Sequence, residues 1–234
     1  MRYEILLFDA DNTILDFDKA EEQALKLAFE KNKLYYDDNV LMCYRRNNIK
    51  QWQLYESGAI KDKNEVLISR FENTFRELNL SVDCKPTADL YESNLHNGCF
   101  VVSNAEEVLQ KLQALNCKLY IVTNGVLSIQ NSRMKGSGMD KYFVKRFVSE
   151  EIGFPKPSKA YFDYCFDNIP NFEKTKTLII GDSLTSDIQG GINSGIDTCW
   201  YNPKRLKNNL RIAPTYEIDD LEQVLKIVLE KRAV

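Results

Sequence analysis

The sequence predicts an α/β fold: a doubly wound parallel sheet with a helical region inserted after the first strand. Short apolar runs alternate with amphipathic helical patterns over residues 98–234, which is typical of parallel strands joined by helices. Residues 17–97 carry helical periodicity without a convincing strand, and they separate the first expected strand from all the others. The helical region is therefore expected to interrupt the sheet-forming part of the chain.

Four runs are expected to form buried strands, because they are short, apolar and rich in β-branched or aromatic residues. The first run ends in Asp9-Ala10-Asp11-Asn12-Thr13, and the later runs also stop at small polar clusters. The four runs comprise residues 3–8, 118–122, 177–180 and 198–201.

Helical patterns fill the intervals between these runs. Residues 105–115 place Val108, Leu112 and Leu115 on one face, and Asn104 is the expected N-cap. The other expected helices comprise residues 158–166, 184–194 and 221–229, the second of which closes at Gly195.

The helical region is long enough to form a small domain of its own. We therefore expect one domain from residues 1–16 and 98–234 and a second from residues 17–97. Aromatic residues at helical spacing in the second domain are expected to pack its core, and stacking on a base is the alternative. They are Trp52, Tyr55, Phe71 and Phe75.

Composition excludes several classes of protein. Lysine and arginine total 31 against 34 aspartates and glutamates, so the net charge of −3 lacks the basic field that binds a nucleic-acid polymer. No apolar run approaches the roughly 20 residues that span a bilayer. The amino terminus carries no apolar run of the kind found in secretory signals, so a cytoplasmic location without a membrane partner is expected.

Cysteine and histidine usage narrows the chemistry. The six cysteines show no C-x-x-C pair, and reduced thiols are expected in a chain of this length without an export signal. His96 is the only histidine, so a His-rich zinc site or a Ser-His-Asp triad would depend on that one residue. Carboxylates, hydroxyls and a lysine are the expected chemical groups.

The polar residues that follow the strands are expected to meet. Parallel sheets bind ligands in the crevice outside the carboxyl ends of their strands. Segments far apart in sequence would contribute to that crevice. The residues concerned are Asp9, Asp11, Thr123, Asn124, Asp182 and Asp187.

Asp9 and Asp11 have a specific chemical interpretation. Residues two apart on extended chain share a face, so both carboxylates could approach one site. Crowded carboxylates repel unless a divalent cation neutralises them, and Mg²⁺ prefers such oxygen ligands. A neutralised carboxylate can then attack phosphorus as a nucleophile. The alternative is that the pair only ends a strand and caps a turn.

Three further residues have two interpretations each. Thr123 could bind a phosphate oxygen or cap a helix. Lys156 lies between Pro155 and Pro157, which could aim its charge or place it on a stiff surface loop. Asp187 could support a metal or simply complement a helix dipole.

Together these clusters resemble, in order and over nearly the whole chain, the haloacid dehalogenase superfamily of aspartate-nucleophile phosphotransferases. Asp9-Ala10-Asp11-Asn12-Thr13 resembles the first motif and Thr123 the second. Lys156 resembles the third motif, and Gly181-Asp182 with Asp187 the fourth. The resemblance implies a Rossmann-like catalytic core, and it implies that the helical insert is an α-helical cap.

The resemblance also implies roles. Asp9 would be the nucleophile, and Asp11 the general acid and then the base that activates water. Thr123, Asn124 and Lys156 would bind the transferring phosphoryl group. The metal residues would be Asp9, Asp11 through its backbone carbonyl, Asp182, and Asp187 in support, with Mg²⁺ as cofactor.

Asp11 also favours phosphate-ester chemistry, because the dehalogenase branch of the superfamily lacks an acid at this place. Asn12 replaces the usual glycine, a tolerable exchange because asparagine readily adopts left-handed backbone. More narrowly, Ile121-Val122-Thr123-Asn124-Gly125 and the segment from Gly181 to Trp200 are similar to the bacterial pyrimidine 5′-nucleotidase, or house-cleaning nucleotidase, branch.

The expected function is that of a Mg²⁺-dependent phosphatase that hydrolyses nucleoside 5′-monophosphates, pyrimidine or non-canonical, through an aspartyl-phosphate intermediate. The expected partner is this small phosphate ester. One alternative is a phosphatase for another small metabolite, such as a sugar phosphate or phosphoglycolate. The non-enzyme alternative is a phospho-acceptor similar to a response-regulator receiver. The sequence leaves base preference and oligomeric state open.

Overall fold

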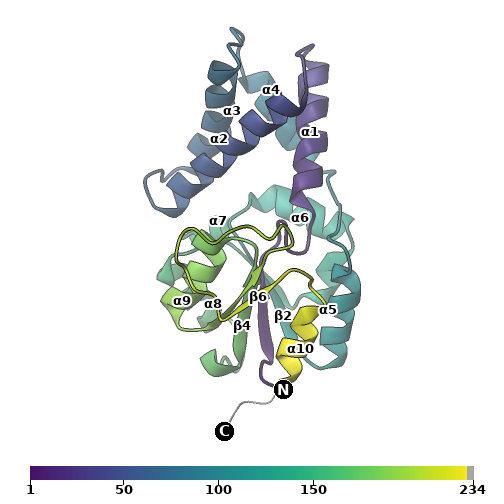
Figure 1. The fold of residues 1–234 in the computed structure, drawn as a ribbon, viewed down its shortest axis with the longest axis vertical. Helices are drawn as coiled ribbons and strands as arrows, with labels where there is room; N and C mark the ends of the chain where they lie inside the picture. Colours follow the sequence, from purple (N-terminus) through teal and green to yellow (C-terminus); the bar gives the residue numbers. More distant parts are fainter. Residues whose placement is uncertain (231–234) are drawn as a thin grey trace. The chain divides into compact units, whose positions relative to one another are not determined.

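The computed structural model describes residues 1–230 and divides the chain into two compact units (Figure 1). The core unit contains Met1–Asp16 and the chain from Phe100 onward, and the helical unit contains Phe17–Cys99. The first boundary thus lies between residues 16 and 17, and the second lies two residues beyond the 97/98 position expected from the sequence.

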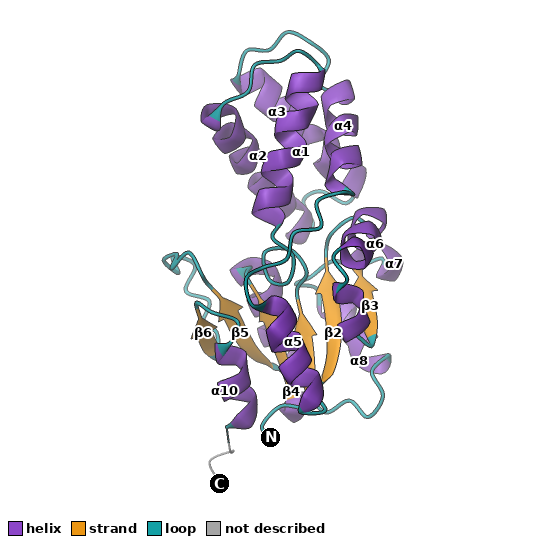
Figure 2. Ribbon diagram, turned by 90° about the vertical axis from the view of Figure 1, so that its right-hand side faces the viewer, coloured by secondary structure: helices purple, strands orange, loops and turns teal. Residues whose placement is uncertain are grey.

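The core unit is built on one sheet of six strands in the order β3-β2-β1-β4-β5-β6 (Figure 2). All five pairings are parallel, and Phe8 of the central strand pairs with Ile121 on one side and Ile180 on the other. The predicted α/β class with a doubly wound parallel sheet is confirmed. The strands are β1 (Ile5–Phe8), β2 (Lys118–Thr123), β3 (Lys145–Val148), β4 (Thr177–Gly181), β5 (Asp197–Tyr201) and β6 (Tyr216–Ile218).

Helices cover both faces of this sheet. Their bounds are α5 (Ala105–Ala114), α6 (Leu127–Gly136), α7 (Ser149–Ile152), α8 (Lys159–Asp167), α9 (Gln189–Ser194) and α10 (Gln223–Leu229). Three short turns complete the unit, namely η1 (Met139–Tyr142), η2 (Lys174–Lys176) and the π-helical turn η3 (Leu184–Ile188).

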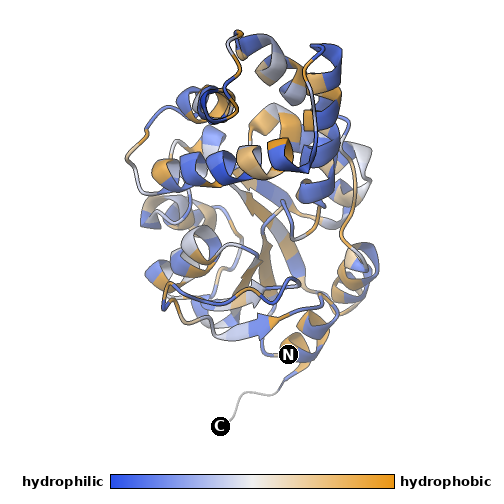
Figure 3. Cartoon of the chain, turned by 45° about the horizontal axis from the view of Figure 1, so that its top comes forward, coloured by the Kyte–Doolittle hydropathy of each residue, from blue (hydrophilic) through white to orange (hydrophobic). Residues whose placement is uncertain are grey.

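Alternation along β1 divides the core into two layers. Leu6 and Phe8 pack into the cluster that contains residues of α5 and α10, whereas Ile5 and Leu7 pack with residues of α8. Successive side chains of a strand point to opposite faces, so a four-residue run that is apolar throughout requires cover on both sides. Figure 3 shows the corresponding mixture of polar and apolar positions along the covering helices.

The structure contains elements that the sequence patterns did not predict. In β3 the first two residues are Lys145 and Arg146, so the strand lacks a continuous apolar run, and β6 has only three residues. The helix expected over residues 184–194 is divided into η3 and α9. Asn104 precedes α5 as predicted, but with a φ of +62° and without a capping hydrogen bond from its side chain.

The helical unit contains α1 (Phe17–Lys31), α2 (Asp38–Glu56), α3 (Lys63–Glu77) and α4 (Lys85–Leu95), and α1 packs on α4 as α2 packs on α3. Tyr55, Phe71 and Phe75 are buried, which confirms their predicted role in core packing. Trp52 is partly buried, with its ring centroid 5.9 Å from that of Tyr55.

Two further expectations concern the whole chain. All six cysteines lie within the described residues and are free, and five of them are buried. Within residues 1–230, none of the helices combines the length and the apolar character needed to cross a membrane.

The close packing of α9 on the sheet generates a stability prediction. A Cβ atom at Gly191 would lie 2.5 Å from Cγ2 of Thr198 and 2.7 Å from Cγ2 of Ile179. Gly191→Ala should therefore lower the free energy of unfolding by about 2 kcal/mol through overpacking. Urea unfolding measures this value. Ile192→Ala, at an exposed position of the same helix, is the control and should change it by less than about 0.5 kcal/mol. Equal unfolding midpoints for the two variants would contradict the packing.

Candidate active site

The central strand β1 lies at the point where the order of the sheet reverses. From β1 the sheet continues through β2 and β3 on one side and through β4, β5 and β6 on the other. Crevices at such a switch point, outside the carboxyl ends of the strands, are the usual ligand sites of open parallel sheets. Asp9 directly follows β1, and its backbone N–H donates to the carbonyl of Ile180, 2.9 Å away. Asp9 therefore lies at the switch point.

Lys156 crosses to this position from the loop before α8. Its Nζ atom lies 2.6 Å from Oδ1 of Asp9, 2.6 Å from Oδ1 of Asp187 and 2.8 Å from the carbonyl oxygen of Val122. These three acceptors match the three donors of an ammonium group, which is 1% exposed. Burial by itself lowers the pKa of Lys156, but the attraction of Asp187 and Asp9 outweighs it and raises that pKa. The lysine therefore stays charged.

Asn124 fixes the backbone of this lysine. The N–H of Lys156 donates to Oδ1 of Asn124 at 2.8 Å, and Nδ2 of Asn124 donates to the Lys156 carbonyl at 3.0 Å. Both polar ends of the amide are thus engaged by one residue. Substrate binding by Asn124 stays a prediction, and the observed contacts of its side chain position Lys156.

Three carboxylates gather around the ammonium. Ligand atoms of Asp9, Asp182 and Asp187 all lie within 4.8 Å of one another. Burial, which the attraction of Lys156 partly offsets, raises the pKa of Asp9 to about 8, and repulsion from Asp187 and Asp11 adds to the rise. Burial is the main cause that raises the pKa of Asp182 well above its usual range, and repulsion from Asp9 and Asp187 adds to it.

This donor set fits a divalent cation. If Asp9, Asp182 and Asp187 are all ionised, they carry three negative charges against the one positive charge of Lys156, and the raised pKa values of Asp9 and Asp182 indicate that this state is costly without a counter-ion. Oxygen ligands of this kind favour hard cations. The arrangement therefore provides a nucleophilic carboxylate, a fixed positive charge and a position for a metal ion.

The turn after β4 holds Asp187 in place. Its Oδ2 atom accepts a hydrogen bond of 3.1 Å from the N–H of Ser183, while Oδ1 accepts from Lys156. A Cβ atom at Gly181 would lie only 2.2 Å from this Oδ2 atom, so a glycine is needed there. Because both oxygens of Asp187 are engaged, Asp9 and Asp182 are better placed to contact a metal directly. Nε1 of Trp200 donates a hydrogen bond of 2.8 Å to the backbone carbonyl of Asp182.

Asp11 lies outside the acidic cluster. Its carboxylate forms an ion pair with Arg133, and Oδ2 accepts a hydrogen bond of 2.6 Å from Nε2 of Gln130. Asn12 follows with a φ of +56°, the left-handed conformation expected for this position. Of the four acids predicted to surround a metal, the structure brings three side chains together. The prediction for Asp11 names its backbone carbonyl as the ligand, and its side chain lies outside the cluster accordingly.

Thr123 ends β2, the strand next to β1, and is buried. Its Oγ1 atom accepts hydrogen bonds from the N–H of Gly125 at 3.0 Å and from Nε2 of Gln130 at 3.4 Å. A hydroxyl that accepts two hydrogen bonds retains its own proton as a donor. Thr123 can therefore donate to an anionic oxygen.

Sequence reasoning missed Gln130 and Arg133. Both are buried in α6, a helix that the apolar pattern did not predict because Gln130 and Arg133 share its buried face with Ile129 and Met134. The available signal was a glutamine and an arginine three residues apart soon after the Thr123 motif, a spacing that places both on one face of a helix.

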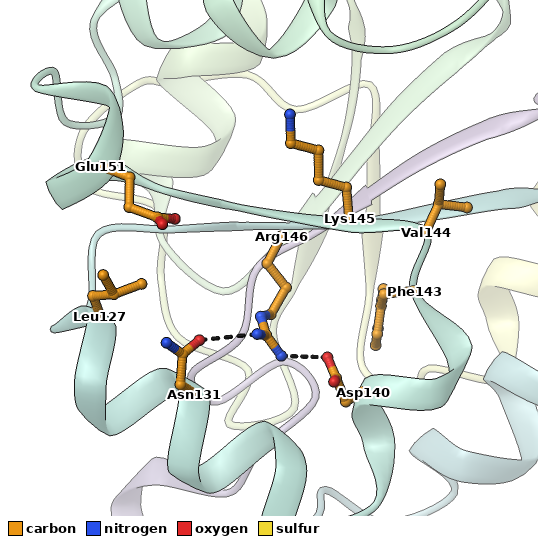
Figure 4. Close-up of a pocket in the computed structure, with 8 residues that line it drawn as sticks. All are labelled: Leu127, Asn131, Asp140, Phe143, Val144, Lys145, Arg146 and Glu151. Atoms are coloured by element: carbon orange, nitrogen blue, oxygen red, sulfur yellow. Dashed lines mark hydrogen bonds and ion pairs between the residues drawn. The ribbon is translucent and has the colours of Figure 1, made fainter.

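A surface pocket of about 430 Å³ lies elsewhere on the core unit, lined by residues of α6, η1, β3 and α7 (Figure 4). Its arginine, Arg146, is already engaged by Asn131 at 2.9 Å and by Asp140. Its lysine, Lys145, donates to Asn168 at 3.2 Å. The pocket includes none of the acidic cluster.

Comparison with known proteins agrees with this geometry. The family of haloacid dehalogenase-like hydrolases matches residues 6–201. The HAD-hydrolase YfnB of Bacillus subtilis is 42% identical over 97% of this chain and 96% of its own length. The crystal structure of YfnB bound to magnesium superposes with a TM-score of 0.91 at 41% identity, and covers 98% of this chain and 100% of that one.

Two relatives carry a more specific name. The pyrimidine 5′-nucleotidase PynA of Streptococcus pneumoniae is 37% identical over 99% of each chain. The pyrimidine 5′-nucleotidase YjjG of Escherichia coli is 30% identical over 97% of this chain and 99% of its own. The resemblance found in the motifs is thereby confirmed, and the chain belongs to the haloacid dehalogenase-like hydrolase family, near its pyrimidine nucleotidases.

Proposed function

We propose that the chain is a Mg²⁺-dependent phosphatase that hydrolyses nucleoside 5′-monophosphates through an aspartyl-phosphate intermediate. The observation that carries the proposal is the buried contact of Lys156 with Asp9 and Asp187, at the switch point of the sheet. The similarity to the pyrimidine 5′-nucleotidases PynA and YjjG supports nucleoside 5′-monophosphates as the substrate class. The magnesium bound by YfnB supports Mg²⁺ as the metal.

The first step forms a covalent bond to Asp9. An oxygen of the Asp9 carboxylate attacks phosphorus, the bond from phosphorus to the ribose oxygen breaks, and that oxygen takes a proton from Asp11. Thr123 donates to an equatorial oxygen, and Lys156, whose three donors are already engaged, attracts the phosphoryl group through its charge. In this step the positive charge of Lys156 is already in position, so little reorganisation is required.

The second step regenerates the enzyme. Asp11, now ionised, accepts a proton from a water molecule as the water attacks phosphorus. The bond between phosphorus and Asp9 breaks, and inorganic phosphate leaves. Asp9, Asp182 and the backbone carbonyl of Asp11, with Asp187 in support, would hold a Mg²⁺ ion, which would supply neutralising charge to the phosphoryl group. Each carboxylate ends the cycle in its initial form.

We assign the role of a cap to the helical unit, which would select the leaving group. The support is its insertion directly after the loop that carries Asp9 and Asp11. A receiver-like phospho-acceptor is disfavoured, because such modules lack a helical insert after the first strand.

A substrate panel tests the substrate class. Release of phosphate should be fastest from pyrimidine nucleoside 5′-monophosphates and should stop when EDTA removes the metal. Sugar phosphates and phosphoglycolate are the comparison substrates. Rapid turnover of those compounds with slow turnover of all nucleotides would replace the nucleotide assignment, and activity that survives EDTA would overturn the metal dependence.

Replacement of the nucleophile tests the covalent mechanism. Asp9→Asn should lower kcat by roughly 10⁴-fold or more, because removing a covalent nucleophile leaves only binding and electrostatic effects. Phosphate release under single-turnover conditions measures the loss. Asp163→Asn, at an exposed carboxylate of α8, is the matched control and should retain normal turnover. Normal turnover by Asp9→Asn itself would refute the assignment.

Metal binding should depend on pH in a defined direction. Folding raises the pKa of Asp9 from 3.8 to about 8, so its contribution to the stability of the metal-free protein is fully present below pH 3.8 and is lost as the pH rises from there through 8. Mg²⁺ binds the ionised carboxylate in competition with the proton. Below pH 8, each increase of one pH unit should therefore lower the Kd of Mg²⁺ by up to about tenfold. The increase in Tm produced by Mg²⁺ should consequently be larger at pH 8 than at pH 6.

Thermal unfolding with Mg²⁺ or with EDTA at both pH values measures this difference. Comparing the increments, rather than the Tm values themselves, removes the contribution of other titrating groups. Asp9→Asn should reduce the pH dependence of the increment, and the part that remains is assigned to Asp182, whose pKa is also raised. Identical increments for the natural chain at pH 6 and pH 8 would contradict the prediction.

A further inference from the structure

Two side chains of α6 converge on the carboxylate of Asp11. Arg133 is 0% exposed and forms an ion pair with Oδ1 of Asp11, and Gln130 is 2% exposed and donates to Oδ2 at 2.6 Å. Each oxygen of the carboxylate thus has its own partner from the same helix. The side chain of Asp11 still retains 27% of its exposure, so the carboxylate is held on one side and open on the other.

A glycine shortly before α6 leaves space for the contact between Gln130 and Asp11. Gly125 lies between β2 and α6, and a Cβ atom there would lie 2.3 Å from Nε2 of Gln130. A side chain at position 125 would therefore displace the glutamine from Asp11. The same Nε2 atom lies 3.4 Å from Oγ1 of Thr123, so Gln130 links Asp11 with the hydroxyl that ends β2.

Stability alone is a poor explanation for these two residues. A fully buried guanidinium is costly even when paired, and apolar side chains of similar volume commonly stabilise a core at least as well. The buried face of α6 has such residues in Ile129 and Met134, beside Gln130 and Arg133. A paired guanidinium and an amide do, however, fix the direction of a carboxylate, which catalysis requires to within fractions of an ångström.

We propose that Gln130 and Arg133 are positioning residues that orient the carboxyl group of Asp11 for proton transfer to the departing oxygen. The inference rests on the proposed function, in which Asp11 is the general acid. Through its contact with Thr123, Gln130 also sets the direction of Asp11 relative to the site of the phosphoryl group.

The test uses the quality of the leaving group. A ribose alkoxide leaves slowly without a proton, whereas p-nitrophenolate leaves readily without one, so a misdirected acid slows the first substrate more than the second. Values of kcat/KM are compared for a nucleoside 5′-monophosphate and for p-nitrophenyl phosphate, because kcat/KM covers the steps up to departure of the leaving group.

The main variant is Gln130→Met, which keeps the volume and removes both hydrogen bonds without leaving a buried charge. It should lower kcat/KM for the nucleotide by about 10-fold to 100-fold and for p-nitrophenyl phosphate by less than about 3-fold. Arg133→Met should show at least the same selectivity, and Arg133→Lys should restore part of the loss. If Arg133→Met does not fold, Gln130→Met still decides the question.

The control is Asn131→Ala, between the two positions on α6, where the side chain contacts Arg146 in the surface pocket (Figure 4). It should affect both substrates alike and only slightly. A fall of equal size for both substrates with Gln130→Met and Arg133→Met would reduce these residues to a structural role and overturn the inference.

Asp11→Asn separates the inference from the proposed function. If Asp11→Asn discriminates between the substrates and the α6 variants do not, the acid assignment stands and the positioning role fails. If Asp11→Asn itself slows both substrates equally, the acid assignment fails and the inference fails with it. Absence of turnover of either substrate by the natural chain would remove the proposed function altogether.

Discussion

The buried ammonium of Lys156 is the interaction on which the rest of the site depends. Without it, Asp9 and Asp187 would be two carboxylates removed from water at short distance, and the turn after β4 could not keep Asp187 inward. With it, the three donors of one cation are fully used and the carboxylates are held apart from each other. When its carboxylates are all ionised, the arrangement has excess negative charge, which favours a divalent cation at this place.

Much of the surrounding structure serves to hold that lysine and its partners. Asn124 uses both ends of its amide on the Lys156 backbone, and the absence of a side chain at Gly181 admits the carboxylate of Asp187. Trp200 holds the backbone of Asp182 from the next strand, β5. These contacts come from the segments after β2, β3 and β4 and from β5 itself, so the parallel sheet supplies the rigidity and the loops supply most of the chemical groups.

A second group of polar side chains, Asp11, Gln130 and Arg133, has contacts different from those of Asp9 and Lys156. Lys156 forms an ion pair with Asp9, whereas Arg133 and Gln130 bind the carboxylate of Asp11, two residues further along the chain. Left-handed backbone at Asn12 turns the chain directly after Asp11. Two neighbouring acids can thus have different partners and different tasks, because their environments are set by different elements.

The sequence by itself determined the fold class, the four motif positions and the helical insert, because apolar runs and the polar residues that end them are local features. The left-handed backbone of Asn12 was predictable for the same reason, since it reflects the conformational preference of a single residue. Only the tertiary structure revealed β3 and β6, which depend on hydrogen bonds to neighbouring strands more than on their own side chains. It alone decided the partners of Asp11, since Arg133 lies 122 residues away in sequence and an arginine on a helix reads as solvent-exposed until its contacts are known.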